Sequence, residues 1–153
     1  MNTMRRLMLC AAMTLLPAAC TTFQIHAPAG FAELTEDERY DYRATNADGV
    51  VIAVRALRNS PEAGLEFWGH VVDERLRRDG YLADGAAEAV HDERGVPGVM
   101  LRYHCTIGGR AHRYLVAVYV RGSKVYVLEA GGDREVFDPV AEVVERSLRS
   151  FHT

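Results

Sequence analysis

The chain has 153 residues, of which 48% are hydrophobic and 25% are charged, and its formal net charge is −3. These values are those of an ordinary globular domain and exclude a disordered or fibrous chain. The charge includes Arg5 and Arg6, so a chain processed after residue 19 would be still more acidic. Arginines are also interspersed with acids, as in the stretch 73–79. Nucleic acid is therefore not an expected partner, because phosphate binding needs clustered positive charge.

The N-terminus has the pattern of an export signal. Residues 1–6 contain two arginines and no acid, and residues 7–16 form an apolar run. A charged start followed by a short apolar run is typical of a signal peptide. The run is too short to span a bilayer, which takes about 20 apolar residues, and Pro17 interrupts it.

The stretch Leu16-Pro17-Ala18-Ala19-Cys20 resembles the lipobox of bacterial lipoproteins, although its leucine stands four residues before the cysteine instead of three. The resemblance implies a signal peptide over 1–19, lipidation of Cys20, and a lipid-anchored tether over 20–35. Two or more acyl chains would make this membrane attachment stable. Thr21 replaces the aspartate that would resemble an inner-membrane retention signal. The expected location is thus the periplasmic face of the outer membrane.

An ordinary secretory signal is the alternative to the lipoprotein signal. Its cleavage site would lie at the small residues Ala27-Pro28-Ala29. Processing there would release a soluble periplasmic binding protein.

The remaining chain, 36–153, is expected to form one domain, and its first elements are a hairpin and a helix. Asp48-Gly49 predicts a tight turn between a strand over 40–45 and a strand over 50–57. The stretch Ser60-Pro61-Glu62 then predicts a helix start. Apolar residues follow at helical spacing, and Gly80 is expected to end this helix. The spaced residues are Leu65, Trp68, Val72 and Leu76.

The second half of the domain predicts an antiparallel meander. After a short strand within 81–90, the turns Gly108-Gly109 and Gly122-Ser123 separate strands over 99–107, 110–120 and 124–130. Pairing across these turns makes both sheet faces largely apolar. One face holds Leu101, Tyr103, Tyr114, Val116, Val118, Val120, Val125 and Val127, and the other holds Met100, Leu115, Ala117, Tyr119, Tyr126 and Leu128. Each face therefore needs a cover.

Asp138-Pro139 predicts a last helix whose apolar face includes Val140, Val144, Leu148 and Phe151. With the earlier helix it can cover both faces of the sheet. The predicted fold class is α+β, a mainly antiparallel twisted sheet between amphipathic helices. The core of such a domain needs neither a disulfide nor a metal.

This order of elements resembles the PsbP-like superfamily, which includes photosystem accessory subunits, a Ran-binding protein and bacterial periplasmic proteins such as DcrB. The stretches 42–55, 67–68 and 125–132 are similar to those of small bacterial lipoproteins of this kind. The resemblance implies a non-enzymatic accessory or binding role in the cell envelope, with the membrane and an envelope protein as partners.

Three residues form a weak candidate for catalysis. Strand pairing places Cys105 opposite His112 and His112 opposite Asp133, the groups that a thiol nucleophile with a histidine base would need. This row gives the alternative function, a thiol-dependent enzyme that uses Cys105 and His112. However, Gly131-Gly132 is expected to end the strand before Asp133, and strand parity predicts that Cys105 is buried. We therefore expect no enzyme.

Other polar and aromatic residues have structural interpretations. Glu129 points toward an apolar face and is expected to pair with an arginine near the end of the sheet. The tyrosine pairs 103/114 and 119/126 are expected to be cross-strand core pairs. The histidines lack the spacing of metal ligands, and no dinucleotide or phosphate-loop motif occurs. The sequence predicts neither a metal nor a cofactor.

Overall fold

The structure of the chain is a computed structural model that describes residues 23–35 and 39–153. In this part of the chain no helix is long and apolar enough to cross a membrane. The signal peptide and the lipidation site Cys20 lie outside the described residues, so lipidation stays a prediction.

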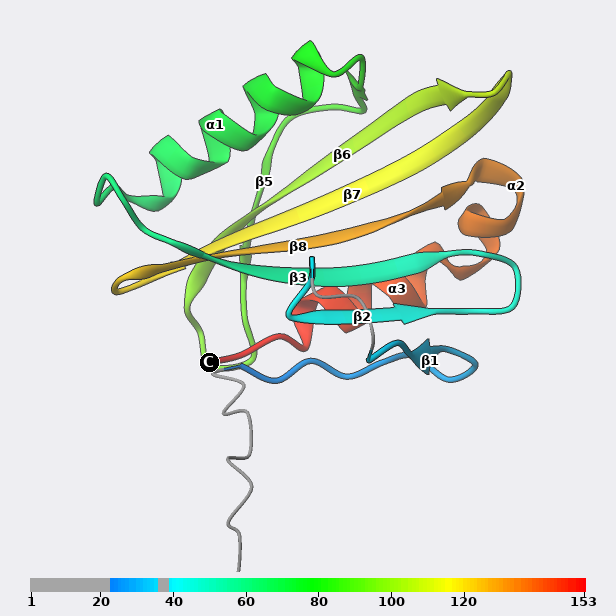
Figure 1. Cartoon of the computed structure of the whole chain (residues 1–153). Helices are drawn as coiled ribbons and strands as arrows, with labels where there is room; N and C mark the ends of the chain where they lie inside the picture. Colours follow the sequence, from blue (N-terminus) through cyan, green and yellow to red (C-terminus); the bar gives the residue numbers. More distant parts are fainter. Residues whose placement is uncertain (1–22, 36–38) are drawn as a thin grey trace, which may run out of the picture.

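The domain is an antiparallel sheet with helices on its two faces (Figure 1). The strand order is β1-β2-β3-β8-β7-β6-β4, with β5 also paired to β6. The strands are β1 (Ala32–Glu33), β2 (Tyr42–Thr45), β3 (Val51–Arg58), β4 (Leu82–Ala83), β5 (Glu88–His91), β6 (Pro97–Ile107), β7 (Arg110–Arg121) and β8 (Lys124–Asp133). The helices are α1 (Leu65–Arg78), α2 (Arg134–Phe137), the 3₁₀ turn η1 (Asp138–Val140) and α3 (Ala141–Arg149). The predicted α+β fold class is confirmed.

The predicted meander and its register are also confirmed. Cys105 pairs with His112, and His112 pairs with Asp133, as counting across the two turns indicated. Gly49, in the first hairpin turn, has a φ of 86°, a conformation that favours glycine. The sequence did not show that β3 pairs with β8, which joins the N-terminal hairpin to the meander and makes β8 the central strand.

The prediction that Gly131-Gly132 ends β8 is wrong, because the strand continues to Asp133. Both glycines lie inside the strand, where neighbouring residues crowd the position that a Cβ would take. A Cβ at residue 131 would lie 2.9 Å from the Tyr114 ring, and one at residue 132 would lie 3.2 Å from Val50. The glycines therefore allow close packing and do not mark a turn.

Helix α1 begins at Leu65, five residues later than Ser60, so the predicted start is wrong. The side chain of Asn59 explains the delay: its Oδ1 accepts a hydrogen bond from the backbone N–H of Ala63 and its Nδ2 donates to Ala63 O. These bonds hold residues 60–63 in a turn outside the helix. The same Oδ1 accepts a bond from Trp68 Nε1 at 2.7 Å, which ties the helix to this turn.

Both sheet faces are covered as predicted. Helix α1 packs its predicted apolar residues on a cluster formed by Val116, Val118, Val125 and Val127. The opposite face carries the larger core, which includes Tyr119, Leu128, Val144, Leu148 and Phe151. Phe151 follows α3 and is not part of the helix, yet it is fully buried.

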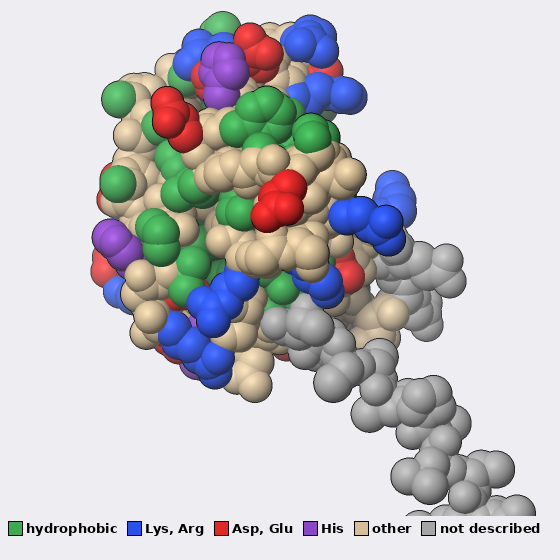
Figure 2. All heavy atoms as spheres, turned by 90° about the vertical axis from the view of Figure 1, so that its left-hand side faces the viewer, with side chains coloured by type: hydrophobic (Ala, Val, Ile, Leu, Met, Phe, Trp, Pro, Cys, Tyr) green, Lys and Arg blue, Asp and Glu red, His purple; other side chains and the backbone are tan. Residues whose placement is uncertain are grey.

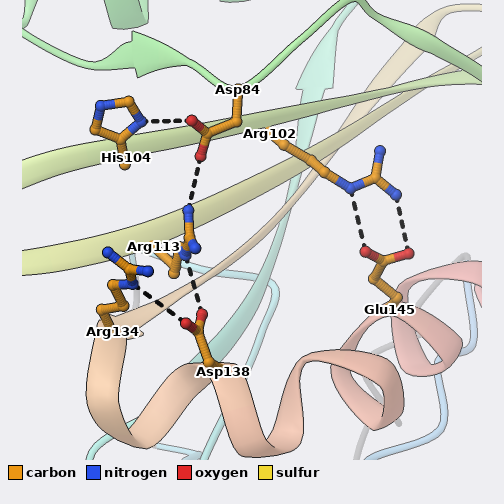
Figure 3. A network of polar contacts seen from close by, with 7 residues as sticks. All are labelled: Asp84, Arg102, His104, Arg113, Arg134, Asp138 and Glu145. Atoms are coloured by element: carbon orange, nitrogen blue, oxygen red, sulfur yellow. Dashed lines mark hydrogen bonds and ion pairs between the residues drawn. The ribbon is translucent and has the colours of Figure 1, made fainter.

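Salt bridges fasten the C-terminal helices to the sheet on this second face (Figure 3). Arg113 on β7 binds Asp84 and Asp138, each at 2.9 Å. On β6, Arg102 contacts Glu145 of α3 through two nitrogens, at 3.2 and 2.9 Å. The network links the edge of the sheet, its central strands and both helices, so its role is structural.

The segment 23–35, expected to be a tether outside the domain, packs against it. Phe23 is buried, and its ring lies 5.7 Å from that of Phe151. Gln24 and His152 exchange backbone hydrogen bonds of 2.8 and 3.0 Å, and Ala32–Glu33 adds the edge strand β1. An apolar side chain and backbone pairing bring these residues into the fold, which composition alone did not indicate.

Candidate functional site

A cavity of about 440 Å³ opens on the face of the sheet that carries α1, beyond the end of that helix. Its floor comes from the ends of β6, β7 and β8 and from the β2–β3 turn, at the right-hand end of the sheet in Figure 1. We call it the end cavity. The lining residues used below are Tyr40, Tyr81, Cys105, His112, Tyr114, Glu129 and Asp133. Its volume is in the range of small-ligand sites, which is about 300–1,000 Å³.

Glu129 lies at the floor of the end cavity, and its side chain is only 12% exposed. The guanidinium of Arg55 on β3 forms a hydrogen-bonded ion pair with it, which confirms the predicted pairing with an arginine. The hydroxyl of Tyr114 also donates a hydrogen bond to this carboxylate. Burial, together with the negative charge of Glu129, raises the pKa of Tyr114 well above its ordinary value. The phenol therefore stays a hydrogen-bond donor.

Aromatic rings form one wall of the cavity. Tyr81, just after α1, packs on Tyr114 with 4.9 Å between ring centroids and on Tyr103 at 6.3 Å. The hydroxyl of Tyr103 donates a 2.6 Å hydrogen bond to Asp73 of α1. This wall separates the apolar packing under α1 from the polar cavity.

Tyr40 lies at the mouth of the cavity among three arginines. The guanidinium carbons of Arg55, Arg43 and Arg39 lie 5.6, 5.7 and 5.9 Å from the centre of its ring. At such distances each cation is attracted to the ring electrons. The mouth therefore presents aromatic and cationic groups together.

The sequence-predicted row Cys105, His112 and Asp133 also lines this cavity. The row is unbroken because β8 extends to Asp133, contrary to our expectation. Cys105 is half-buried at the cavity wall, so the prediction of a buried cysteine is wrong as well. The strand parity was right, but helix α1 ends before it reaches this position.

The hydrogen bonds of the row differ from those of a catalytic triad. His112 Nδ1 donates to the backbone oxygen of Arg110 at 3.0 Å. The carboxylate of Asp133 accepts from the backbone N–H of Glu135 at 3.1 Å and from Arg110 Nε at 3.0 Å. Asp133 thus caps α2 and does not orient the imidazole. Burial raises the pKa of the Cys105 thiol, which disfavours the thiolate that a nucleophile needs.

Among residues 23–35 and 39–153 there is no group of three or more metal-ligating side chains that could hold an ion. Sequence reasoning found Glu129, Cys105 and His112 but missed Tyr40, Arg55 and Tyr81. These three come from a loop, from β3 and from the residues just after α1. Only the pairing of β3 with β8 and the length of α1 bring them to one place, and no local pattern signals either.

Solved structures share this fold. Cyanobacterial PsbP (CyanoP) from Synechocystis sp. PCC 6803 is 15% identical, with a TM-score of 0.62 over 96% of this chain and 98% of that chain. The Ran-binding protein Mog1p of Saccharomyces cerevisiae is 14% identical, with a TM-score of 0.56 over 85% of this chain and 89% of that chain. A Pseudomonas aeruginosa protein of unknown function, 12% identical, also has a TM-score of 0.56, over 88% and 86%. The predicted PsbP-like fold is confirmed.

The amino-acid sequence itself has no such match. No protein-family model matches the chain, and no curated protein matches it.

Proposed function

We propose that this PsbP-like chain is a lipid-anchored protein of the bacterial cell envelope whose end cavity binds a segment of a partner protein without catalysing a reaction. The anchor rests on the sequence, in which an export signal ends at Cys20. Thr21 favours the outer membrane, with the domain in the periplasm.

The observation that carries the binding role is the concentration of tyrosine and arginine at the end cavity. Tyr40, Tyr81 and Tyr114 meet there with Arg43 and Arg110, and Arg55 lies against the ring of Tyr40. Tyr and Arg are enriched among the residues that dominate protein interfaces, since both combine apolar area with hydrogen-bonding groups. The exposed side chain of Ile107 at the rim adds an apolar contact.

The fold neighbours support a binding role in a more general way. Mog1p is a Ran-binding protein, so a domain of this fold can bind a protein partner. CyanoP is a PsbP protein. Because the sequence identities are 15% or less, the neighbours support the class of function and not the identity of the partner.

The anchor is tested by mass spectrometry of the mature protein. We expect an N-terminus at Cys20 carrying diacylglycerol. A mature chain that begins beyond Ala29 without lipid would support the soluble periplasmic protein instead.

The binding site is tested by photo-crosslinking in living cells. A photo-reactive amino acid at Ile107 should yield a discrete crosslinked product, because this side chain stands at the cavity rim. The matched control is Glu142 on α3, whose side chain is 84% exposed and lies on the opposite face of the sheet. Equal products from both positions, or none from Ile107, would contradict the proposed site.

A further inference from the structure

The chain that follows the proposed anchor is held on the domain from its first described residue. Phe23 is buried, with its ring 6.0 Å from that of Tyr126. Farther along, the backbone N–H of His26 donates to Ser150 Oγ at 2.9 Å, and Ser147 Oγ donates to His26 O at 2.6 Å. These contacts leave no free tether between Phe23 and the body of the domain.

The distance from anchor to domain is therefore short. Cys20 precedes Phe23 by three residues, which span at most about 11 Å when fully extended. A lipidated Cys20 lies at the bilayer interface, because its acyl chains are in the hydrocarbon. The end of the domain that holds Phe23 must then lie at the membrane surface.

That end carries a row of positive side chains. Arg58 on β3 pairs with Lys124 on β8, and Lys124 pairs with Arg121 on β7. Lys124 stands two residues before Tyr126, which contacts Phe23, so the row lies about 7 Å farther along the strand. By strand parity the three side chains lie on the same face as Tyr126.

The figures place the row and the chain end together. The β7–β8 hairpin and the C-terminus, which pairs with Gln24, lie toward the same left-hand side in Figure 1. Figure 2 views the molecule from that side and shows several Lys and Arg side chains on it. Lysine and arginine side chains near a bilayer are attracted to anionic lipid headgroups.

We propose that Arg58, Lys124 and Arg121 dock this end of the sheet on anionic phospholipid headgroups, so that the domain sits upright on the bilayer. This proposal rests on the lipid anchor proposed above. The strand β8 spans about 30 Å from Lys124 to Asp133, which places the end cavity far from the membrane. The cavity then faces the periplasm, open to a partner protein.

The test measures how close two positions lie to the membrane. Mature lipidated protein with Cys105→Ala is labelled with a fluorophore at Ser123→Cys, in the β7–β8 turn, or at Ala111→Cys, at the opposite end. It is placed in vesicles of phosphatidylcholine and phosphatidylglycerol that contain a headgroup-quencher lipid. We expect quenching at residue 123 to be several times that at residue 111. Equal quenching, or stronger quenching at residue 111, would overturn the proposal.

A charge reversal tests the role of the row. Arg121→Glu should reduce the quenching at residue 123 at least two-fold, and the reduction should vanish in vesicles of phosphatidylcholine alone. Arg78→Glu, an equal change on exposed α1 at the other end, should have no effect. If both variants behave alike, the row does not dock the domain.

Lack of lipid on Cys20 would refute the anchor and this proposal together, whereas equal quenching at residues 123 and 111 in lipidated protein would refute this proposal alone.

Discussion

The sheet face that carries α1 has a covered half, under the helix, and an open half beyond it. The two halves are built from the same strands but differ in the polarity of their side chains. Under the helix, Val116, Val118 and Val127 are buried in an apolar cluster. Beyond the helix, the same strands present His112, Tyr114 and Glu129 to the end cavity. Val116 and Glu129 are direct cross-strand partners, so the change occurs within one residue pair. Side-chain polarity on a strand thus follows the extent of the covering helix.

The largest expected effect comes from placing a charge in the covered half. Val118→Asp should destabilise the fold by about 5 kcal/mol, because the carboxylate would be buried without a partner. Thermal unfolding measures the loss. Ile107→Asp is the control in the open half, where the side chain is 54% exposed, and should change stability by no more than about 0.5 kcal/mol. Similar losses of stability in Val118→Asp and Ile107→Asp would contradict the division of this face into a covered and an open half.

A smaller loss of stability is expected when the ion pair in the open half is removed. Arg55→Met should cost about 2 kcal/mol, since it leaves the poorly exposed Glu129 carboxylate with one partner fewer. Denaturant unfolding gives this value. Arg78→Met removes an exposed arginine from α1 and should be nearly neutral. A neutral Arg55→Met would show that Glu129 does not need the pair.

The opposite face of the sheet should show sensitivity to acid. Hydrogen bonds from Arg149 and Arg102 hold the pKa of Glu88 below its usual value, and those from Arg113 and Arg134 do the same for Asp138. A lowered pKa in the folded state adds stability above the ordinary carboxyl pKa of about 4, and this stability is lost as the pH falls further.

Because Glu88 and Asp138 are more than one-third exposed, solvent weakens each contribution to under about 1 kcal/mol. We expect Tm to fall by roughly 5 °C between about pH 5 and about pH 3. Asp138→Asn should reduce this slope, whereas Glu142→Gln, at an exposed position on α3, should preserve it. An unchanged slope in Asp138→Asn would exclude this ion pair as a cause.

The smallest effect is expected at Cys105. Its raised pKa predicts slow alkylation of the native protein near neutral pH, with a rate that rises only at alkaline pH. His112→Ala should leave that rate unchanged, because the imidazole bonds to the backbone of Arg110. Rapid alkylation that is lost in His112→Ala would instead support a thiol-dependent enzyme.

Sequence reasoning succeeded where local rules decide the structure. Alternating apolar residues and glycine turns predicted the register of β6, β7 and β8, which placed Cys105 opposite His112. It failed where contacts distant in sequence decide. Gly131 leaves space for the ring of Tyr114, and the hydrogen bonds of Asn59 hold the residues before α1 outside the helix. No pattern in the sequence identifies these partners. The end cavity was missed because the end of α1 determines where it opens.

We propose that the open half of this face is the binding surface. The most direct test measures the crosslinking yield from Ile107 in Tyr81→Ser, which alters the cavity wall, and in Phe67→Ser, which alters the exposed side of α1. Both variants are first shown to keep the wild-type fold by circular dichroism. We expect the crosslinking yield to fall at least several-fold in Tyr81→Ser and to stay unchanged in Phe67→Ser. An unchanged yield in Tyr81→Ser, or a loss only in Phe67→Ser, would contradict it.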